Sequence, residues 1–170
     1  MIRISISISL LTVLLSTCVP TLEAQSTWDR YRPARLDTVI QNHSHLPNKL
    51  PDTSGSTKLL TISRRFPLRT KLEYGGEIRS ISSTTERLIQ SWAEARSIDA
   101  PVKELFDNEV LFIGEEGSYW LPVQSKLVPF LKNKWPKGGL LELYVQFVGA
   151  SAKNGDSNWV FVVNGYEELD

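Results

Sequence analysis

The feature that most restricts the fold of this chain is an alternation of charged and apolar residues that runs from Arg69 to Ile81. A period of two is typical of a strand with one buried face. The phase continues through Gly75-Gly76, and a two-residue hairpin turn there would place Tyr74 opposite Glu77, mixing apolar with charged residues on one face. The pattern therefore predicts one long strand that bends at the glycines, as strands of small barrels do where they turn a corner. The charged positions are Arg69, Lys71, Glu73, Glu77 and Arg79, and the apolar positions are Leu72, Tyr74 and Ile78.

A helix is predicted directly after this strand. Ser83-Thr84-Thr85-Glu86 has the form of a capping box, which satisfies the first free amides of a helix. Apolar residues then recur at helical spacing, so we expect a helix over about residues 84–97 that ends before Pro101. Its apolar face consists of Leu88, Ile89, Trp92, Ala93 and Ala95.

The other strands are predicted from short runs of alternating, β-branched and aromatic residues. One hairpin is expected to turn at Gly114–Gly117, and a second hairpin is expected to carry a polar loop over 150–157. Between the two hairpins, residues 127–131 indicate a short helical segment. The expected strands cover 59–63, 109–113, 118–124, 141–148 and 159–163, and residues 164–170 are expected to form an acidic tail.

These elements predict a mainly β protein with one amphipathic helix. About five strands, with a helical segment before the last two, resemble the OB-fold, a small and partly open five-stranded barrel. The resemblance covers about Arg69 to Val163 and concerns the fold alone. The helix at 84–97 is an extra element, and the alternative is an α+β sheet with this helix packed on one face.

The first 24 residues have the pattern of a secretory signal peptide. A short positive start precedes the apolar run Ile4–Leu15, and a small residue, Ala24, stands at the expected cleavage position before Gln25. The apolar run is shorter than the roughly 20 residues that span a bilayer, so no membrane span is expected after signal removal. The alternative is an N-terminal anchor that is not cleaved. We therefore expect a secreted or periplasmic protein.

Cys18 and the residues after the predicted signal peptide bear on two questions, which are whether the chain is lipidated and how the mature chain divides into segments. Residues 15–18 resemble a bacterial lipoprotein cleavage box, which makes Cys18 a candidate for lipidation and for anchoring at the cell envelope. If cleavage follows Ala24, the mature chain has no cysteine and therefore no disulfide. Residues 25–56 are rich in proline and serine without periodicity and predict a flexible arm, followed by a single β-rich globular domain over 57–170.

Charge and residue inventory exclude several classes of function. Nineteen basic residues balance nineteen acidic ones, so the basic excess typical of nucleic-acid binding is absent. Both histidines, His43 and His45, lie in the predicted arm, which argues against histidine-dependent triads and zinc sites, and no cofactor or metal is expected. A hydrolase with paired carboxylates is the weakest of three hypotheses. Its candidate residues are Glu104, Asp107, Glu109, Glu115 and Glu116.

Aromatic residues and one polar loop supply the candidate ligand site. Exposed rings on a barrel face suit proteins, peptides or glycans, because they give large contact area at low entropic cost. We expect a non-enzymatic binding or accessory module of unknown ligand, and the alternative is an envelope-anchored structural or interaction protein. The candidate site residues are Tyr119, Trp120, Tyr144, Lys153, Asn154 and Asp156.

Overall fold

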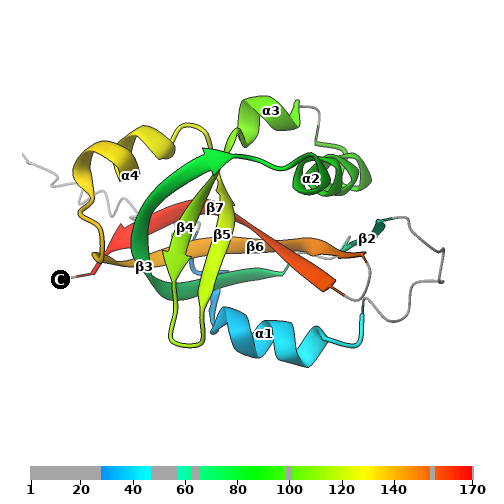
Figure 1. The fold of residues 1–170 in the computed structure, drawn as a ribbon, viewed down its shortest axis with the longest axis horizontal. Coiled ribbons are helices and arrows are strands. Elements are labelled where there is room, and N and C mark those ends of the chain that lie inside the picture. Colours follow the sequence, from blue (N-terminus) through cyan, green and yellow to red (C-terminus); the bar gives the residue numbers. More distant parts are fainter. Residues whose placement is uncertain (1–27, 47–56, 63–65, 99–100, 154–155, 170) are drawn as a thin grey trace, which may run out of the picture.

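The computed structural model describes residues 28–46, 57–62, 66–98, 101–153 and 156–169. The described residues form a seven-stranded mixed sheet with the order β1-β3-β4-β5-β7-β6-β2 (Figure 1). The fold is therefore mainly β, as predicted. The strands are β1 (Arg32–Pro33), β2 (Lys58–Thr61), β3 (Pro67–Ser80), β4 (Asn108–Ile113), β5 (Ser118–Val123), β6 (Leu140–Lys153) and β7 (Asp156–Glu168), and the helices are α1 (Leu36–His43), α2 (Ser83–Ala95), α3 (Val102–Leu105) and α4 (Val128–Lys134).

Strand β3 is the long bent strand that the alternation predicts. Tyr74 lies opposite Phe112 and Ile78 lies opposite Val110, so four positions along β3 correspond to two along β4. The extra residues are even in number, which keeps the alternation in phase, and Tyr74 is 4% exposed. A Cβ at Gly75 would lie 2.7 Å from a side-chain carbon of the facing strand, so this bend needs a residue without a side chain.

Strand β3 pairs with two strands, β6 and β4, and these two are connected to each other through β5 and β7. Its first half pairs with β6 and its second half with β4. β4 pairs with β5, β5 meets β7 through Val123 and Val163, and β7 pairs with β6. The short strands β1 and β2 extend this set of five, β1 beside β3 and β2 beside β6.

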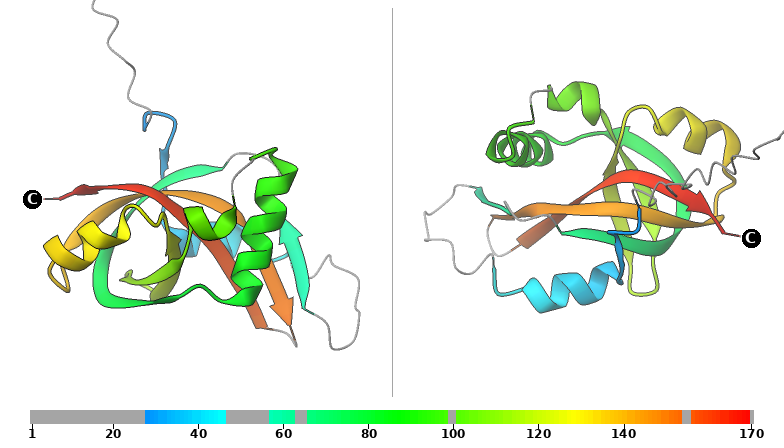
Figure 2. Two further views of the ribbon diagram at one scale, coloured as in Figure 1. Left: turned by 90° about the horizontal axis from the view of Figure 1, so that it is seen from above. Right: turned by 180° about the vertical axis from the view of Figure 1, so that it is seen from behind.

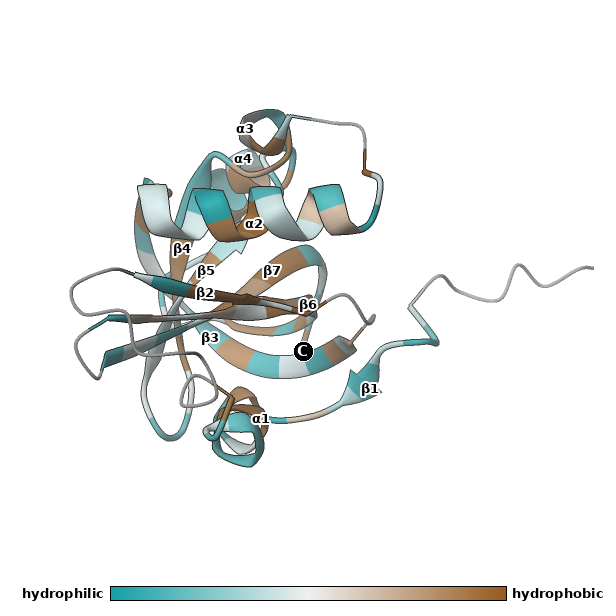
Figure 3. Cartoon of the chain, turned by 90° about the vertical axis from the view of Figure 1, so that its right-hand side faces the viewer, coloured by the Kyte–Doolittle hydropathy of each residue, from teal (hydrophilic) through white to brown (hydrophobic). Residues whose placement is uncertain are grey.

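Two clusters of buried side chains lie on opposite faces of β6 and β7. The larger includes Phe147 and Phe161, and the smaller joins Val148 and Val162 to the apolar face of α2. Figures 1 and 3 place α1 and α2 on opposite sides of these strands, and the strands between the helices are coloured as hydrophobic in Figure 3. Both faces of β6 and β7 are therefore covered, which their apolar composition requires.

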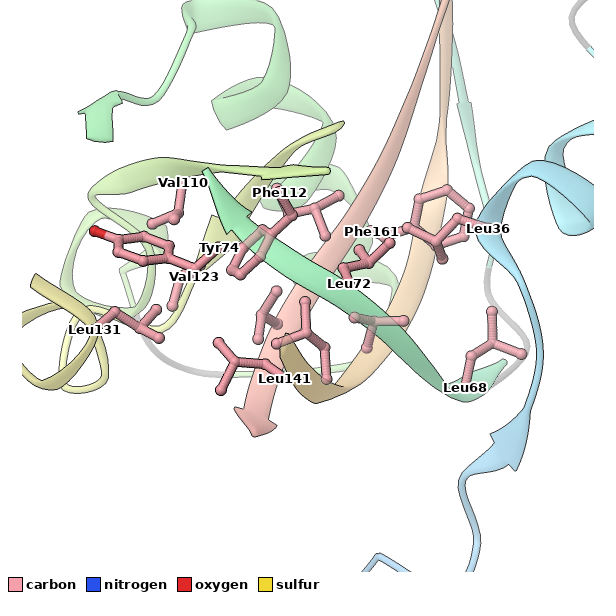
Figure 4. Close-up of a cluster of buried hydrophobic side chains, with 14 of the residues drawn as sticks. Leu36, Leu68, Leu72, Tyr74, Val110, Phe112, Val123, Leu131, Leu141 and Phe161 are labelled. Carbon is pink, nitrogen blue, oxygen red and sulfur yellow. The ribbon is translucent and has the colours of Figure 1, made fainter. Parts of the chain in front are cut away.

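Two helices lie at opposite ends of the larger cluster. Leu131 of α4 is found at one end and Leu36 of α1 at the other (Figure 4). The views in Figure 2 place α4 at one end of the β6–β7 pair and the hairpin tip of that pair at the other. The short helical segment predicted at 127–131 is thus confirmed as α4, which begins at Val128.

Several predicted boundaries are corrected. The N-cap of α2 is Ser82, whose hydroxyl accepts a hydrogen bond of 3.1 Å from the Thr85 amide, so the capping residue stands one position earlier than predicted. The polar loop predicted at 150–157 is mostly strand, because Ala150 pairs with Trp159 and Lys153 with Asp156. The acidic tail predicted at 164–170 continues β7 to Glu168. Pairing with the neighbouring strand overrides the low strand propensity of the small and acidic residues here.

The flexible arm expected over 25–56 is corrected for its described part. β1 pairs with β3, and α1 follows with Leu36 and Val39 only 2% and 6% exposed. The apolar positions of α1 have helical spacing, but a helix of eight residues is too short for that spacing to stand out in the sequence. Residues 1–27, with Cys18 and the predicted cleavage site, lie outside the described residues, as do 47–56.

Candidate functional site: a cationic groove beside α4

The candidate site begins with the way in which α4 is attached to β3. After α4, the turn Pro136–Gly139 closes with a 3.0 Å hydrogen bond from the Gly139 amide to the Pro136 carbonyl. Tyr74 of β3 donates its amide to the Gly139 carbonyl and accepts from the Gly138 amide, at 2.9 and 2.8 Å. Gly138 has a φ of +85°, which favours glycine. Two backbone hydrogen bonds thus hold the turn against the bend of β3.

An open groove of about 660 Å³ lies where α4 and this turn meet β3 and β4. Its volume falls in the range of roughly 300–1,000 Å³ that small-molecule sites occupy. Its walls combine aromatic and aliphatic side chains with two lysines. The lining residues are Tyr74, Gly76, Ile78, Asn108, Val128, Lys132, Trp135 and Lys137, and we call this surface the α4 groove.

The charged residues among the described lining of the α4 groove are all positive. They are Lys132 and Lys137, and none of these described lining residues is a carboxylate. A Cβ at Gly76 would lie 3.2 Å from the Lys137 side chain, so the glycine leaves room for the lysine stem to lie across β3. Within the described part of the chain, neither lysine forms an ion pair. The groove therefore offers two cations to a ligand.

Two further polar groups belong to the groove lining. The Trp135 indole packs over Gly139, and its Nε1 is buried without a hydrogen-bond partner among the described residues. Such an unpaired donor costs free energy until an acceptor reaches it. Burial raises the pKa of the Tyr74 phenol.

The structure distributes the residues predicted as a ligand site over separate surfaces. Tyr119 is half-buried and lines a small cavity beside α1, whereas Trp120 lies on the outward face of β5, with the Arg79 guanidinium carbon 4.0 Å from its ring centroid. Lys153 and Asp156 pair at the tip of the β6–β7 hairpin. Asn154 lies outside the described residues.

Tyr144 is buried, contrary to the exposed position expected for it. It is 3% exposed because Trp28 and Tyr31 of the N-terminal segment cover it, with ring centroids 4.6 and 5.4 Å away. Burial, followed by a hydrogen bond with the Glu167 side chain, raises the pKa of Tyr144 to about 12. These rings belong to packing rather than to an open surface.

Three of the five predicted catalytic carboxylates take part in ion pairs. Glu109 is buried and accepts from Arg79 Nε at 2.8 Å. Glu115 and Glu116 in the β4–β5 turn both face Arg35, at 2.5 and 3.4 Å. Among the described residues, no group of three or more metal-ligating side chains is found.

One feature of the sequence could have indicated the α4 groove, but it is a distribution of charge along the chain rather than a motif. Between Glu116 and Glu142 the chain has four lysines and no acidic residue. This one-sided segment contains α4 and its turn. Which of these lysines share a surface depends on the path of β3, and the sequence does not reveal that path.

Comparisons with protein-family models, curated proteins and solved structures gave no match for this chain. Among the described residues, none of the helices has the length and apolar character needed to cross a membrane.

Proposed function

We propose that strands β3 to β7 form an OB-like barrel. The circular order of pairings supports this proposal, since β3, β4, β5, β7 and β6 each pair with two others of the set. The glycine bend of β3 and the position of α4 before the last two strands agree with it as well. In this arrangement α4 closes one end of the barrel, so the α4 groove lies at its rim.

On this fold we propose a secreted or periplasmic, non-enzymatic binding or accessory module. Its ligand is an anion with an apolar or aromatic part. The observation that carries the proposal is the lining of the α4 groove. Lys132 and Lys137 lie there beside Trp135 and Ile78, and the described lining residues include no carboxylate. Cations attract the anionic group, and the flat apolar walls accept the remainder of the ligand.

A binding role fits the described carboxylates better than hydrolysis does. A glycosidase needs two carboxyl groups that face each other across a cleft. Glu109 and Glu115 instead point to different arginines, Arg79 and Arg35, and neither lines the α4 groove.

A matched pair of probes tests the proposed ligand class. The anionic dye 8-anilinonaphthalene-1-sulfonate should bind with a saturable rise in fluorescence, and the uncharged N-phenyl-1-naphthylamine should bind more weakly. The double variant Lys132→Gln/Lys137→Gln should lose about tenfold or more in affinity for the anionic dye. Lys134→Gln, on the same helix but outside the groove lining, is the matched control. Equal affinity in the double variant and the control would exclude the α4 groove.

Secretion is proposed from the N-terminal pattern, and the mature N-terminus tests it. Mass spectrometry of the protein from its native host should give a chain that starts at Gln25. A lipidated chain that starts at Cys18 would favour the envelope-anchored alternative, and an intact Met1 would contradict both.

A second ligand surface is proposed around Trp120. Its half-buried ring lies outward on β5 beneath Arg79, on a strand face of the kind that OB-like barrels use for ligands. If this face binds a peptide or glycan, Trp120→Ala should weaken binding while Lys132→Gln leaves it unchanged.

A further inference from the structure

A second pocket, separate from the α4 groove, lies between the C-terminal end of α2 and the N-terminal segment. It has a volume of about 190 Å³ and opens over the face of β6 and β7 that packs against α2. This is smaller than the roughly 300 Å³ at which drug-sized ligand sites begin, so it suits a small group. The lining residues are Arg30, Tyr31, Pro67, Trp92, Arg96, Ile98, Gln146 and Asn164, and we call this the α2 pocket.

Two arginines line the α2 pocket, and none of its described lining residues is a carboxylate. The Arg30 guanidinium carbon lies 5.8 Å from the ring centroid of Tyr31, and that of Arg96 lies 5.6 Å from the ring centroid of Trp92. Cation–π contacts of this kind hold a guanidinium near a ring. Arg96 makes a further interaction as well, and the five N–H donors of a guanidinium allow it to contact a ligand beside that interaction. Each arginine comes from a different side of the pocket, one from the N-terminal segment and one from α2.

The strongest indication of a ligand is an unpaired donor. Trp92 is 8% exposed, and its indole Nε1 is buried without a hydrogen-bond partner among the described residues. Buried N–H groups are nearly always paired, so an orphaned one in a pocket lining calls for an acceptor. An oxyanion supplies acceptor atoms and is attracted by the two arginines at the same time.

Polar side chains of β6 and β7 that line the α2 pocket are held in place by hydrogen bonds. Asn164 Nδ2 donates to the Tyr31 hydroxyl at 3.2 Å, and its Oδ1 accepts from Gln124 Nε2 at 3.1 Å. Gln146 is buried, and its Nε2 donates to the Phe147 carbonyl at 2.9 Å. These bonds tie the floor of the pocket to the N-terminal segment that carries Arg30.

The last carbonyl groups of α2 accept hydrogen bonds, so they repel an anion less than the free carbonyl groups of an uncapped helix would. The Ile98 amide donates to the Ala93 carbonyl and the Ser97 amide to the Glu94 carbonyl, both at 3.0 Å. This is the Schellman arrangement, which satisfies the last carbonyls of a helix. The positive charge of Arg96 at the C-cap further offsets the negative end of the helix dipole.

We propose that the α2 pocket binds an oxyanion, carried either by a phosphate or sulfate group or by the carboxylate of a small ligand. Arg30 and Arg96 hold the charge from two sides, and Trp92 Nε1 donates to one of its oxygen atoms. This site does not depend on the α4 groove or on the ligand proposed for it.

The indole N–H resonance of Trp92 reports directly on this pocket. In the ¹⁵N-labelled full protein it is assigned by its loss in Trp92→Phe. Sodium phosphate, sodium sulfate and sodium acetate are each added at constant ionic strength, with sodium chloride as the balancing salt. We expect a saturable shift of this resonance. Saturation by phosphate or sulfate identifies a tetrahedral oxyanion, and saturation by acetate alone identifies a carboxylate.

Arginine variants keep the test decisive if Trp92→Phe does not fold. Arg30→Gln and Arg96→Gln should each lower the affinity about tenfold, the loss expected for a charge-assisted hydrogen bond. Arg87→Gln, an exposed position on the same helix, is the matched control and should stay within about twofold of the unmodified protein. A shift that is linear in every salt, or an affinity that is equal in all three variants, would overturn the proposal.

Discussion

The indole of Trp28 stacks on the phenol of Tyr144 with 4.6 Å between their ring centroids. The edge of Tyr31 lies against both rings. Gly165 is paired with Tyr144 across β6 and β7, and a Cβ there would lie 2.7 Å from the Trp28 ring. The absence of a side chain at Gly165 thus creates the space that Trp28 fills, and this contact docks the N-terminal segment onto the sheet.

Replacing Trp28 with alanine should weaken this docking. Trp28 is half-buried, so the loss should be about 2 kcal/mol, less than for a fully buried tryptophan. Thermal melts should show a fall in midpoint of roughly 4–8 °C. Trp28→Phe preserves a ring over Gly165 and should lose clearly less. A melt of Trp28→Ala that matches that of the unmodified protein would show that the stack contributes little.

Removing residues 1–56 should destabilise the domain strongly, because the described part of that segment supplies core side chains. Leu36, Val39 and Tyr31 are 2%, 6% and 6% exposed, and burying each contributes about 1.5–3 kcal/mol. The midpoint should therefore fall by more than about 10 °C. Removing residues 1–24 alone is the control and should leave the midpoint unchanged. Equal melting midpoints for the two truncations would show that this segment is a flexible arm.

The success of the sequence predictions depends on the range of the interactions involved. The strand over Arg69–Ile81 and the helix over 84–97 are marked by local periodicity, and both were confirmed to within a few residues. The order of the strands in the sheet, and the burial of the small residues of β6, depend on pairing between distant segments. Local patterns contain no information about such pairing.

The candidate sites were harder to predict for the same reason. Tyr144 occupies a polar phase of its strand in the sequence, yet it is buried because Trp28 covers it. The α4 groove joins Lys132 to Tyr74, and the α2 pocket joins Arg30 to Arg96. Each pair is far apart in the chain and shares no motif, so only the folded structure brings its members together.

Gly149 is the position where a side chain should be tolerated least. A Cβ there would lie 2.0 Å from the backbone carbonyl oxygen of Leu60 in β2, and a backbone atom cannot move aside as a side chain can. Gly149→Ala should therefore separate β2 from β6 and cost about 2 kcal/mol or more. Amide exchange of β2 would detect the loss. At Gly117 a Cβ would meet nothing within 4 Å, so Gly117→Ala is the matched control. Equal exchange in the two variants would contradict this.

Asp37 should make stability depend on acid pH. The Arg35 guanidinium, hydrogen-bonded to it at 2.5 and 3.1 Å, holds the pKa of the Asp37 carboxyl below its usual range. The resulting stabilisation is present above the unfolded pKa of about 3.9 and is lost as pH falls through the lower folded value. Asp37→Asn should be less stable than the unmodified protein at pH 7 and should lose less on acidification.

Urea unfolding at pH 7 and at about pH 2.5, below the ordinary range of aspartate, measures this difference. Asp107→Asn, which removes an exposed carboxylate outside the Arg35 cluster, serves as the control. If Asp37→Asn and Asp107→Asn show the same change in unfolding free energy between the two pH values, the Arg35–Asp37 pair does not couple to folding.

Ser97 should be a position where glycine stabilises the protein. It has a φ of +53°, the left-handed conformation that the residue after a helix C-cap adopts and that glycine adopts at least cost. Part of that gain is offset because glycine also has more freedom in the unfolded chain. Ser97→Gly should therefore stabilise by about 0.5–1 kcal/mol and raise the melting midpoint by a few degrees. Ser97→Ala removes the same hydroxyl but keeps the Cβ, so it should bring no gain. A midpoint that rises equally in both variants would assign the effect to the loss of the hydroxyl, and a fall in Ser97→Gly would contradict the backbone explanation.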